Sequence, residues 1–203
     1  MDTLSGVDRV SLERYAQLIV TRGCNVQPGQ FFQIGADAES TDFAVLVAEA
    51  AYQAGAAFVN VDLSDDRIQR ARILRSVKEE FLDHVPSHIP VRFDEMIESR
   101  GAVVRLIGPK DPNVLSGMPA DKTNRVRLAG HQAAKRFYSE GIGLSAVQWC
   151  VAAAATIGWA ESIMDDVQGE KARQCLWNEL LQIVRADKED VFERWTDHVA
   201  HLK

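Results

Sequence analysis

The chain has 203 residues, 46% of them hydrophobic and 26% charged, and its formal net charge is -6. This composition is typical of a folded globular protein, and an acidic balance without a basic stripe argues against nucleic acid as a partner. No apolar run reaches the roughly 18 residues that a membrane span needs, and the N-terminus MDTLSGVDR lacks a signal peptide's apolar segment, so we expect a cytoplasmic protein with no membrane partner.

Hydrophobic periodicity and turn residues predict the elements in chain order. Ser11 opens the first expected helix, and Gly23 stands where its C-cap should be. The stretch NVQPGQ at 25–30 indicates a turn. The elements predicted after it are a strand at 31–36, a helix at 40–54, a strand at 56–65, helices at 65–82 and 88–100, a strand at 101–109, a helix at 119–138, a strand at 146–155, and helices at 158–166, 170–185 and 188–203.

This alternation of strands and helices predicts the fold class. Strands separated by crossover helices pair in parallel, and right-handed crossovers place helices on both faces of the sheet. We therefore expect an α/β fold with an open, mostly parallel sheet of about four to five strands, Rossmann-like but without a nucleotide fingerprint. The sequence has no internal repeat and no linker, so residues 1–203 are predicted to form a single domain.

The search for a nucleotide site gives only weak matches. The string GIGLSA at 141–146 has the spacing G-x-G-x-x-A, but it follows a predicted helix and precedes a strand, the reverse of the arrangement that binds a pyrophosphate. Gly35 is a lone glycine after the first strand, and Asp62 lies where a ribose-binding acid would be. Ser64 and Asp65 are better interpreted as caps of the next helix.

Two pairs of histidines have the spacing of possible metal ligands. His84 and His88 are four residues apart, but Pro86 between them argues against a continuous helix. His198 and His201 lie on the last predicted helix, where the helix dipole already favours imidazoles. Neither pair has the spacing of a known metal motif, so we expect no metal ligand among them.

The candidate nucleophiles are equally weak. Cys24, Cys150 and Cys175 are far apart in sequence and have apolar neighbours, which indicates buried free thiols in a reducing compartment. No G-x-S-x-G elbow is present. The residues alone therefore predict no catalytic, cofactor-binding or metal-binding side chain in this chain.

Several stretches, taken in order, resemble the N-terminal half of the thermophilic metallo-aminopeptidases of the aminopeptidase T and PepS type. They are LERYAQLIVTRGCNVQPGQ (12–30), LVAEAAYQAGAAFVNVDLSD (46–65), GAVVRLIGPKDPNVLSGMPADK (101–122) and the segment CLWNELLQIVRAD to WTDHVAHLK (175–203). Their order and spacing cover nearly the whole chain. One stretch departs from the family pattern: in AAAATIGWA, Ala155 and Gly158 replace prolines, which predicts a looser or more helical segment.

The resemblance implies a dimeric enzyme about twice this length that removes N-terminal residues from peptides with two divalent metal ions, zinc or cobalt. The metal ligands and the catalytic glutamate of that family lie in the C-terminal half, which would begin beyond Lys203. We therefore expect a fragment of a longer protein, without catalytic or metal-binding residues, whose partner is the absent catalytic domain. It would meet peptide substrate only indirectly.

The resemblance thus predicts an accessory domain that helps to enclose the substrate chamber. An exposed apolar face involving Trp195 and residues 146–160 would then mark the contact with the catalytic half. Two alternatives stay open. One is a free-standing domain that binds a small anion or nucleotide near Gly35, Asp62 and Gly108. The other is an adaptor that forms a symmetric interface through its final helices.

Overall fold

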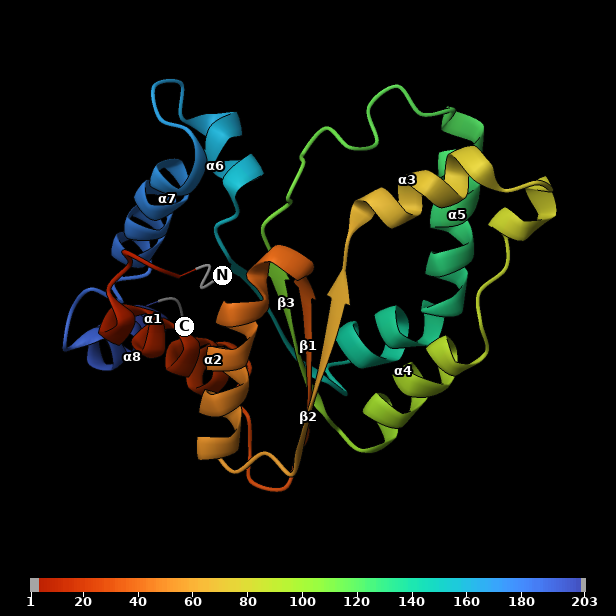
Figure 1. The fold of residues 1–203 in the computed structure, drawn as a ribbon. Helices are drawn as coiled ribbons and strands as arrows, with labels where there is room; N and C mark the ends of the chain where they lie inside the picture. Colours follow the sequence, from red (N-terminus) through yellow and green to blue (C-terminus); the bar gives the residue numbers. More distant parts are fainter. Residues whose placement is uncertain (1–3, 202–203) are drawn as a thin grey trace.

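The computed structural model describes residues 4–201 and contains one sheet of four parallel strands (Figure 1). The strands are β1 (Phe31–Asp37), β2 (Phe58–Ser64), β3 (Ala102–Ile107) and β4 (Gln148–Ala153), in the spatial order β2-β1-β3-β4. Phe31 pairs with Phe58, Phe32 with Ala102, and Ala102 with Gln148, which sets the three registers. The open parallel α/β sheet that the sequence predicts is confirmed.

Eight α-helices surround the sheet in the described part of the chain. They are α1 (Arg9–Leu18), α2 (Thr41–Gln53), α3 (Asp66–Arg75), α4 (His88–Glu98), α5 (Ala120–Ala133), α6 (Ile157–Ile163), α7 (Gly169–Ile183) and α8 (Val191–His201). Short helical turns η1 (Ile19–Gly23), η2 (Ala38–Ser40), η3 (Glu79–Leu82) and η4 (Phe137–Ile142) join them. Figure 1 shows α1, α2 and α7 on one side of the strands, and α3, α4 and α5 on the other. None of the described helices is long and apolar enough to cross a membrane.

The main core lies between the sheet and the layer of α1, α2 and α7. Phe32 and Ile34 of β1 are fully buried in it, because alternate residues of a strand point to the same face. An aromatic row extends this core outward: Phe43 stacks on Tyr15 at 5.3 Å between ring centroids and meets Trp177 at 4.9 Å. Burial of these large side chains is the main stabilising contribution to the fold.

The opposite face of the sheet is covered unevenly. Met96 and Phe137, from α4 and η4, pack over the amino ends of the strands together with Phe31 and Val103. The cluster formed by α3, η3 and α5, by contrast, contains no strand residue among its described members, which are Ile73, Leu82, Val126, Leu115 and Met118. The carboxyl half of this sheet face therefore stays open.

Exposed apolar side chains extend along this face of β3 and β4, from beside the covered amino ends into the open half. Ile107 of β3 and Trp149 and Val151 of β4 are 47%, 49% and 53% exposed. Strand register places them on the same face, with Arg105 between them. Trp195, which the sequence analysis placed on the exposed face, instead packs partly buried against the main core and donates its indole N–H to the carbonyl of Val184 at 2.8 Å.

The first helix differs from the prediction at both ends. Asp8 is the N-cap, not Ser11: its carboxylate accepts a hydrogen bond from the Ser11 amide at 2.9 Å and another from the Ser11 hydroxyl at 2.6 Å. At the other end Gly23 closes the π-helical turn η1, and Asn25 takes the positive φ of 47°. Asparagine tolerates this conformation better than most residues, which explains why glycine is not needed there.

Two helices that were predicted as continuous are broken. The predicted helix at 65–82 ends at Arg75 and resumes only as η3, because the Arg72 guanidinium bonds the carbonyls of Phe81, Leu82 and His84 and folds the chain back. The predicted helix at 119–138 ends at Ala133 and is followed by η4. The fourth strand and the last three helices lie where the pattern places them.

Candidate functional site

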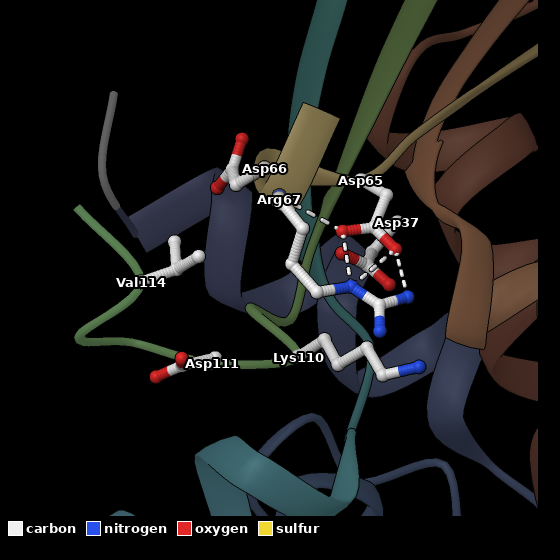
Figure 2. Close-up of a pocket in the computed structure, with 7 residues that line it drawn as sticks. All are labelled: Asp37, Asp65, Asp66, Arg67, Lys110, Asp111 and Val114. Atoms are coloured by element: carbon white, nitrogen blue, oxygen red, sulfur yellow. Dashed lines mark hydrogen bonds and ion pairs between the residues drawn. The ribbon is translucent and has the colours of Figure 1, made fainter. Parts of the chain in front are cut away.

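The carboxyl ends of β1, β2 and β3 are the place where an open α/β sheet usually binds a ligand. Strand order reverses between β1 and β3, so Asp37 and the loop after Ile107 face each other there. Figure 2 shows the side chains that line this edge. They are Asp37, Asp65, Asp66, Arg67, Lys110, Asp111 and Val114. The cavity between them measures only about 10 Å³, which is room for about one water molecule.

Asp65 and Arg67 form an ion pair at this edge. The Arg67 Nε donates to both carboxylate oxygens of Asp65 at 2.9 Å, and the Arg67 amide donates to the same carboxylate, which makes Asp65 the N-cap of α3 as predicted (Figure 2). These bonds from the Arg67 side chain and then its amide lower the pKa of Asp65 to about 2. Ser64 has another role: its hydroxyl bonds the Ala36 carbonyl of the neighbouring strand at 3.2 Å.

Gly35, Asp62 and Gly108 do not converge on a ligand site. A side chain at Gly35 would meet the Arg105 guanidinium, since its Cβ would lie 3.0 Å from Nη1. Asp62 lies within β2 and pairs with Arg92 of α4. Gly108 packs against the segment that follows β4, where a Cβ would fall 1.8 Å from the carbonyl oxygen of Ala154. The strand-end surface is shallow and acidic, which argues against the anion or nucleotide alternative.

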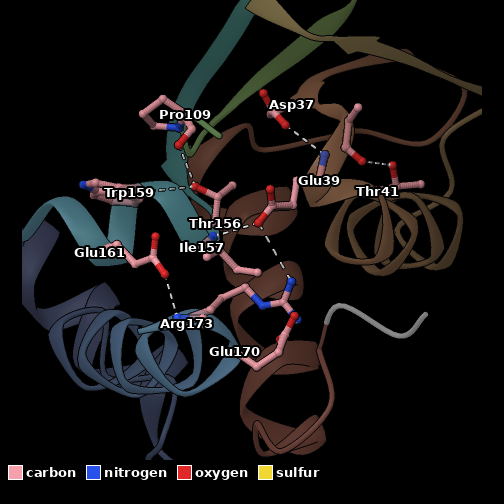
Figure 3. Close-up of polar contacts among 12 residues, drawn as sticks. Asp37, Glu39, Thr41, Pro109, Thr156, Ile157, Trp159, Glu161, Glu170 and Arg173 are labelled. Carbon is pink, nitrogen blue, oxygen red and sulfur yellow. Dashed lines mark hydrogen bonds and ion pairs between the residues drawn. The ribbon is translucent and has the colours of Figure 1, made fainter. Parts of the chain in front are cut away.

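A network of buried polar groups, which sequence reasoning missed, anchors the same strand ends to α6 and α7 (Figure 3). The Asp37 carboxylate accepts from the Glu39 amide at 2.8 Å, and the Glu39 carboxylate accepts from the Ile157 amide at 2.7 Å. Arg173 of α7 lies 4.0 Å from Glu39 and also pairs with Glu170. These residues are far apart in sequence, so no local pattern could have revealed them.

The segment that departs from the family pattern is well packed. Thr156 is fully buried, donates its hydroxyl to the Pro109 carbonyl at 2.7 Å and caps α6 by accepting from the Trp159 amide at 3.4 Å (Figure 3). At Gly158 a Cβ would fall 1.7 Å from the carbonyl oxygen of Lys110, so only glycine allows this close approach. The segment leaves β4 at Ala153 and becomes helical from Ile157, where α6 begins.

The histidines and the G-x-G-x-x-A string lie in helices and turns of the fold. Among residues 4–201 no three His, Cys, Asp or Glu side chains are placed to hold a metal ion. His88 is the first residue of α4 and His84 lies in the turn before it. His198 meets Trp195 edge-on at 5.6 Å, and a ring nitrogen of His201 lies 2.6 Å from the Asp197 carbonyl. Residues 141–146 comprise the last two residues of η4 and the turn that leads to β4.

Comparison with known proteins decides the family. The family of thermophilic metalloproteases, M29, matches residues 8–203 of this chain. The chain belongs to the M29 family. In sequence it is 32% identical over 190 residues to aminopeptidase T from Thermus thermophilus. It is 31% identical over 197 residues to aminopeptidase PepS from Streptococcus thermophilus.

The structural comparison agrees with this M29 assignment. Wild-type AmpT from Thermus thermophilus superimposes with a TM-score of 0.77 at 30% identity, over 85% of this chain and 43% of that one. The matches to aminopeptidase T and PepS cover 93% and 95% of this chain but only 45% and 46% of those proteins. The chain therefore spans slightly less than half the length of the M29 relatives that it matches. The described residues contain no group of three or more His, Cys, Asp or Glu side chains that could hold a metal ion, so they do not fit the pair of metal ions that the resemblance implies.

The pKa of Asp65 predicts how acid affects this edge. The Asp65 pKa lies at about 2 in the folded chain, below its ordinary value of 3.8. The stability that its ionised form contributes is therefore fully present above pH 3.8 and is lost as the pH falls through about 2. Asp65→Asn keeps a capping side chain without the charge, so we expect it to be less stable than the wild type at pH 5, with a difference that shrinks on acidification.

Urea unfolding of both proteins between pH 5 and pH 2.5 measures this difference. Asp8, Asp83 and Asp190 also have lowered pKa values, but they titrate equally in the two proteins. The difference between wild type and variant therefore isolates Asp65. A difference that stays constant across this range would rule out the assigned role of its ionised carboxylate.

Proposed function

We propose that residues 1–203 act as one non-catalytic domain of a cytoplasmic, metal-dependent aminopeptidase. In this proposal the domain packs beside the catalytic half and helps to enclose the peptide chamber of a dimeric enzyme. The two divalent ions, zinc or cobalt, would be held by residues outside this chain. The M29 match over residues 8–203 and the coverage of less than half of each relative support this assignment. The three unpaired thiols are in keeping with a reducing compartment.

The open half of the sheet carries the proposal. Ile107, Trp149 and Val151 each leave about half of their side-chain surface exposed on one face of β3 and β4. On that face the amino ends of the strands pack against α4 and η4, and the opposite face is covered by the main core. A group of large apolar side chains exposed together on a sheet indicates a contact surface. We assign it to the catalytic half, because relatives of twice this length must place their second half against some surface of this domain.

Such a contact also explains how the domain would select substrates. A wall beside the active site admits short peptides and hinders long ones, so selectivity comes from access and not from a pocket on the domain itself. The strand-end cavity of about 10 Å³ is too small for an amino-acid side chain, which agrees with an indirect role.

A domain replacement in AmpT tests the proposal. Residues 1–203 replace the matching part of that enzyme, and hydrolysis of a dipeptide is compared with hydrolysis of a long unstructured peptide. Val151→Glu places a charge in the proposed contact and is expected to raise the ratio of long to short peptide hydrolysis several-fold, because the wall loosens.

Ile183→Glu is the matched control. Ile183 is 72% exposed on α7, on the other side of the sheet, so the same charge there should leave the ratio unchanged. If Val151→Glu and Ile183→Glu behave alike, the open sheet face is not the contact and the proposed enclosing role fails. A symmetric self-interface through the final helices, as in an adaptor, would instead respond to Ile183→Glu.

A further inference from the structure

Two cysteines that are distant in sequence lie side by side in the fold. Cys24 directly follows η1, the turn that ends the first helical segment, and Cys150 lies in the middle of β4. The Cys150 side chain lies against the backbone at Gly23, the residue just before Cys24, and its sulfur lies 3.6 Å from the carbonyl oxygen of Val151. The Cys24 sulfur also lies 3.4 Å from the carbonyl oxygen of Val103, and both cysteines carry free thiols.

Gly23 allows this close approach. A Cβ at Gly23 would fall 2.8 Å from the Cys150 sulfur, closer than real side-chain carbons come. Gly23 is not one of the glycines with a positive φ. Its role here is therefore to leave space for the Cys150 side chain and not to adopt a special backbone conformation. The backbone beside Cys24 is thereby held against the Cys150 side chain.

The two thiols differ in exposure and in acidity. Cys24 is 1% exposed, and the neighbouring Cys150 thiol together with burial raises the pKa of its thiol. Cys150 is only partly buried, and the neighbouring Cys24 thiol lowers the pKa of its thiol. The thiolate is the reactive form, so Cys150 is the sulfur that meets a reagent from solvent first.

We propose that Cys24 and Cys150 are a redox site, which a low-molecular-weight disulfide such as glutathione disulfide converts reversibly into an intramolecular disulfide. The Cys150 thiolate attacks one sulfur of glutathione disulfide, whose S–S bond breaks and releases a glutathione thiolate. The Cys24 sulfur then attacks the Cys150 sulfur of the mixed disulfide, whose bond to glutathione breaks, and the departing glutathione thiolate takes up the Cys24 proton. The two protein thiols are oxidised, and one glutathione disulfide is reduced to two glutathione molecules.

The bond would join the end of the first helical segment to the edge strand of the sheet. It closes a loop that contains β1, β2, β3 and the helices between them. Long loops of this kind restrict the unfolded chain strongly, so the oxidised protein is expected to unfold at a higher temperature than the reduced one.

Intact-mass measurement of the folded full chain tests the proposal. The reduced chain is incubated with glutathione disulfide, then unfolded in urea with N-ethylmaleimide so that every remaining thiol, the buried Cys24 included, is blocked, and the mass is recorded with and without later reduction. We expect a product that takes up a single maleimide, carries no glutathione on Cys24 or Cys150, and gives a Cys24–Cys150 cross-linked peptide on proteolysis. Reduction should restore three reactive thiols.

Two serine variants separate this site from ordinary thiol reactivity. Cys175→Ser removes the third thiol and should leave the cross-link intact, whereas Cys24→Ser removes the resolving sulfur and should leave glutathione attached to Cys150. Three maleimides on the oxidised wild-type chain, a stable glutathione adduct on Cys150, or a cross-link that includes Cys175 would each overturn the proposal. None of these outcomes depends on the peptidase assignment.

Discussion

Trp177→Ala is expected to lower the free energy of unfolding by about 3–5 kcal/mol, the range for truncating a buried aromatic residue. Trp177 is 1% exposed and meets Phe43 at 4.9 Å between ring centroids, with Tyr15 stacked beyond it. Alanine removes the aromatic contact and leaves a cavity in the layer that joins α1, α2 and α7. Urea unfolding followed by circular dichroism measures the loss.

Trp177→Phe is the matched comparison. The Trp177 indole N–H has no hydrogen-bond partner among the described residues, so phenylalanine loses ring volume without orphaning another polar group. We expect it to cost less than half as much as alanine. Equal losses for the two variants would mean that the indole N–H is bonded after all and that packing is not the main contribution.

The second large effect is expected at Arg173. Its side chain is 4% exposed and lies between Glu39, which is 12% exposed, and the more exposed Glu170. Arg173→Ala would leave Glu39 buried beside the Ile157 amide without its cation, and removing one partner of a buried pair typically costs about 3–5 kcal/mol. The hydrogen bond from the Ile157 amide to Glu39 persists, so we expect the free energy of unfolding to fall by about 3 kcal/mol, measured by the same urea unfolding.

A double variant distinguishes the ion pair from simple packing. Glu39→Gln keeps an acceptor for the Ile157 amide, and Arg173→Met keeps an apolar stem of similar length. Combined, they remove both charges, so the double variant should be more stable than Arg173→Ala. If it is not, the contribution of Arg173 comes from its shape and its bond to Glu170 and not from Glu39.

Sequence reasoning predicted the sheet well, for a physical reason. The strand around Ile34 is buried on both faces, and such a strand shows as an apolar run between turn residues. The resemblance was confirmed by the M29 match, because the matching stretches are spread along the chain in order. The break after Arg75 was missed, since it depends on Arg72 bonding carbonyls further along the chain.

The candidate site was predicted less completely. Asp65 was identified as a cap because capping depends on residues two or three apart in sequence. The Glu39–Arg173 network and the Cys24–Cys150 contact were missed, because each joins segments more than a hundred residues apart. Gly158 was noticed as a departure from the family, but its reason, the close approach of the Lys110 carbonyl, exists only in the folded chain.

The most direct test of the account is an aminopeptidase assay of the 203-residue chain itself. The purified chain is incubated with zinc or cobalt and a dipeptide, and released amino acids are measured against a blank that contains metal alone. The account predicts no release above the blank, because the proposed catalytic residues lie outside this chain. Release that follows the protein through purification and disappears on addition of a chelator would contradict it.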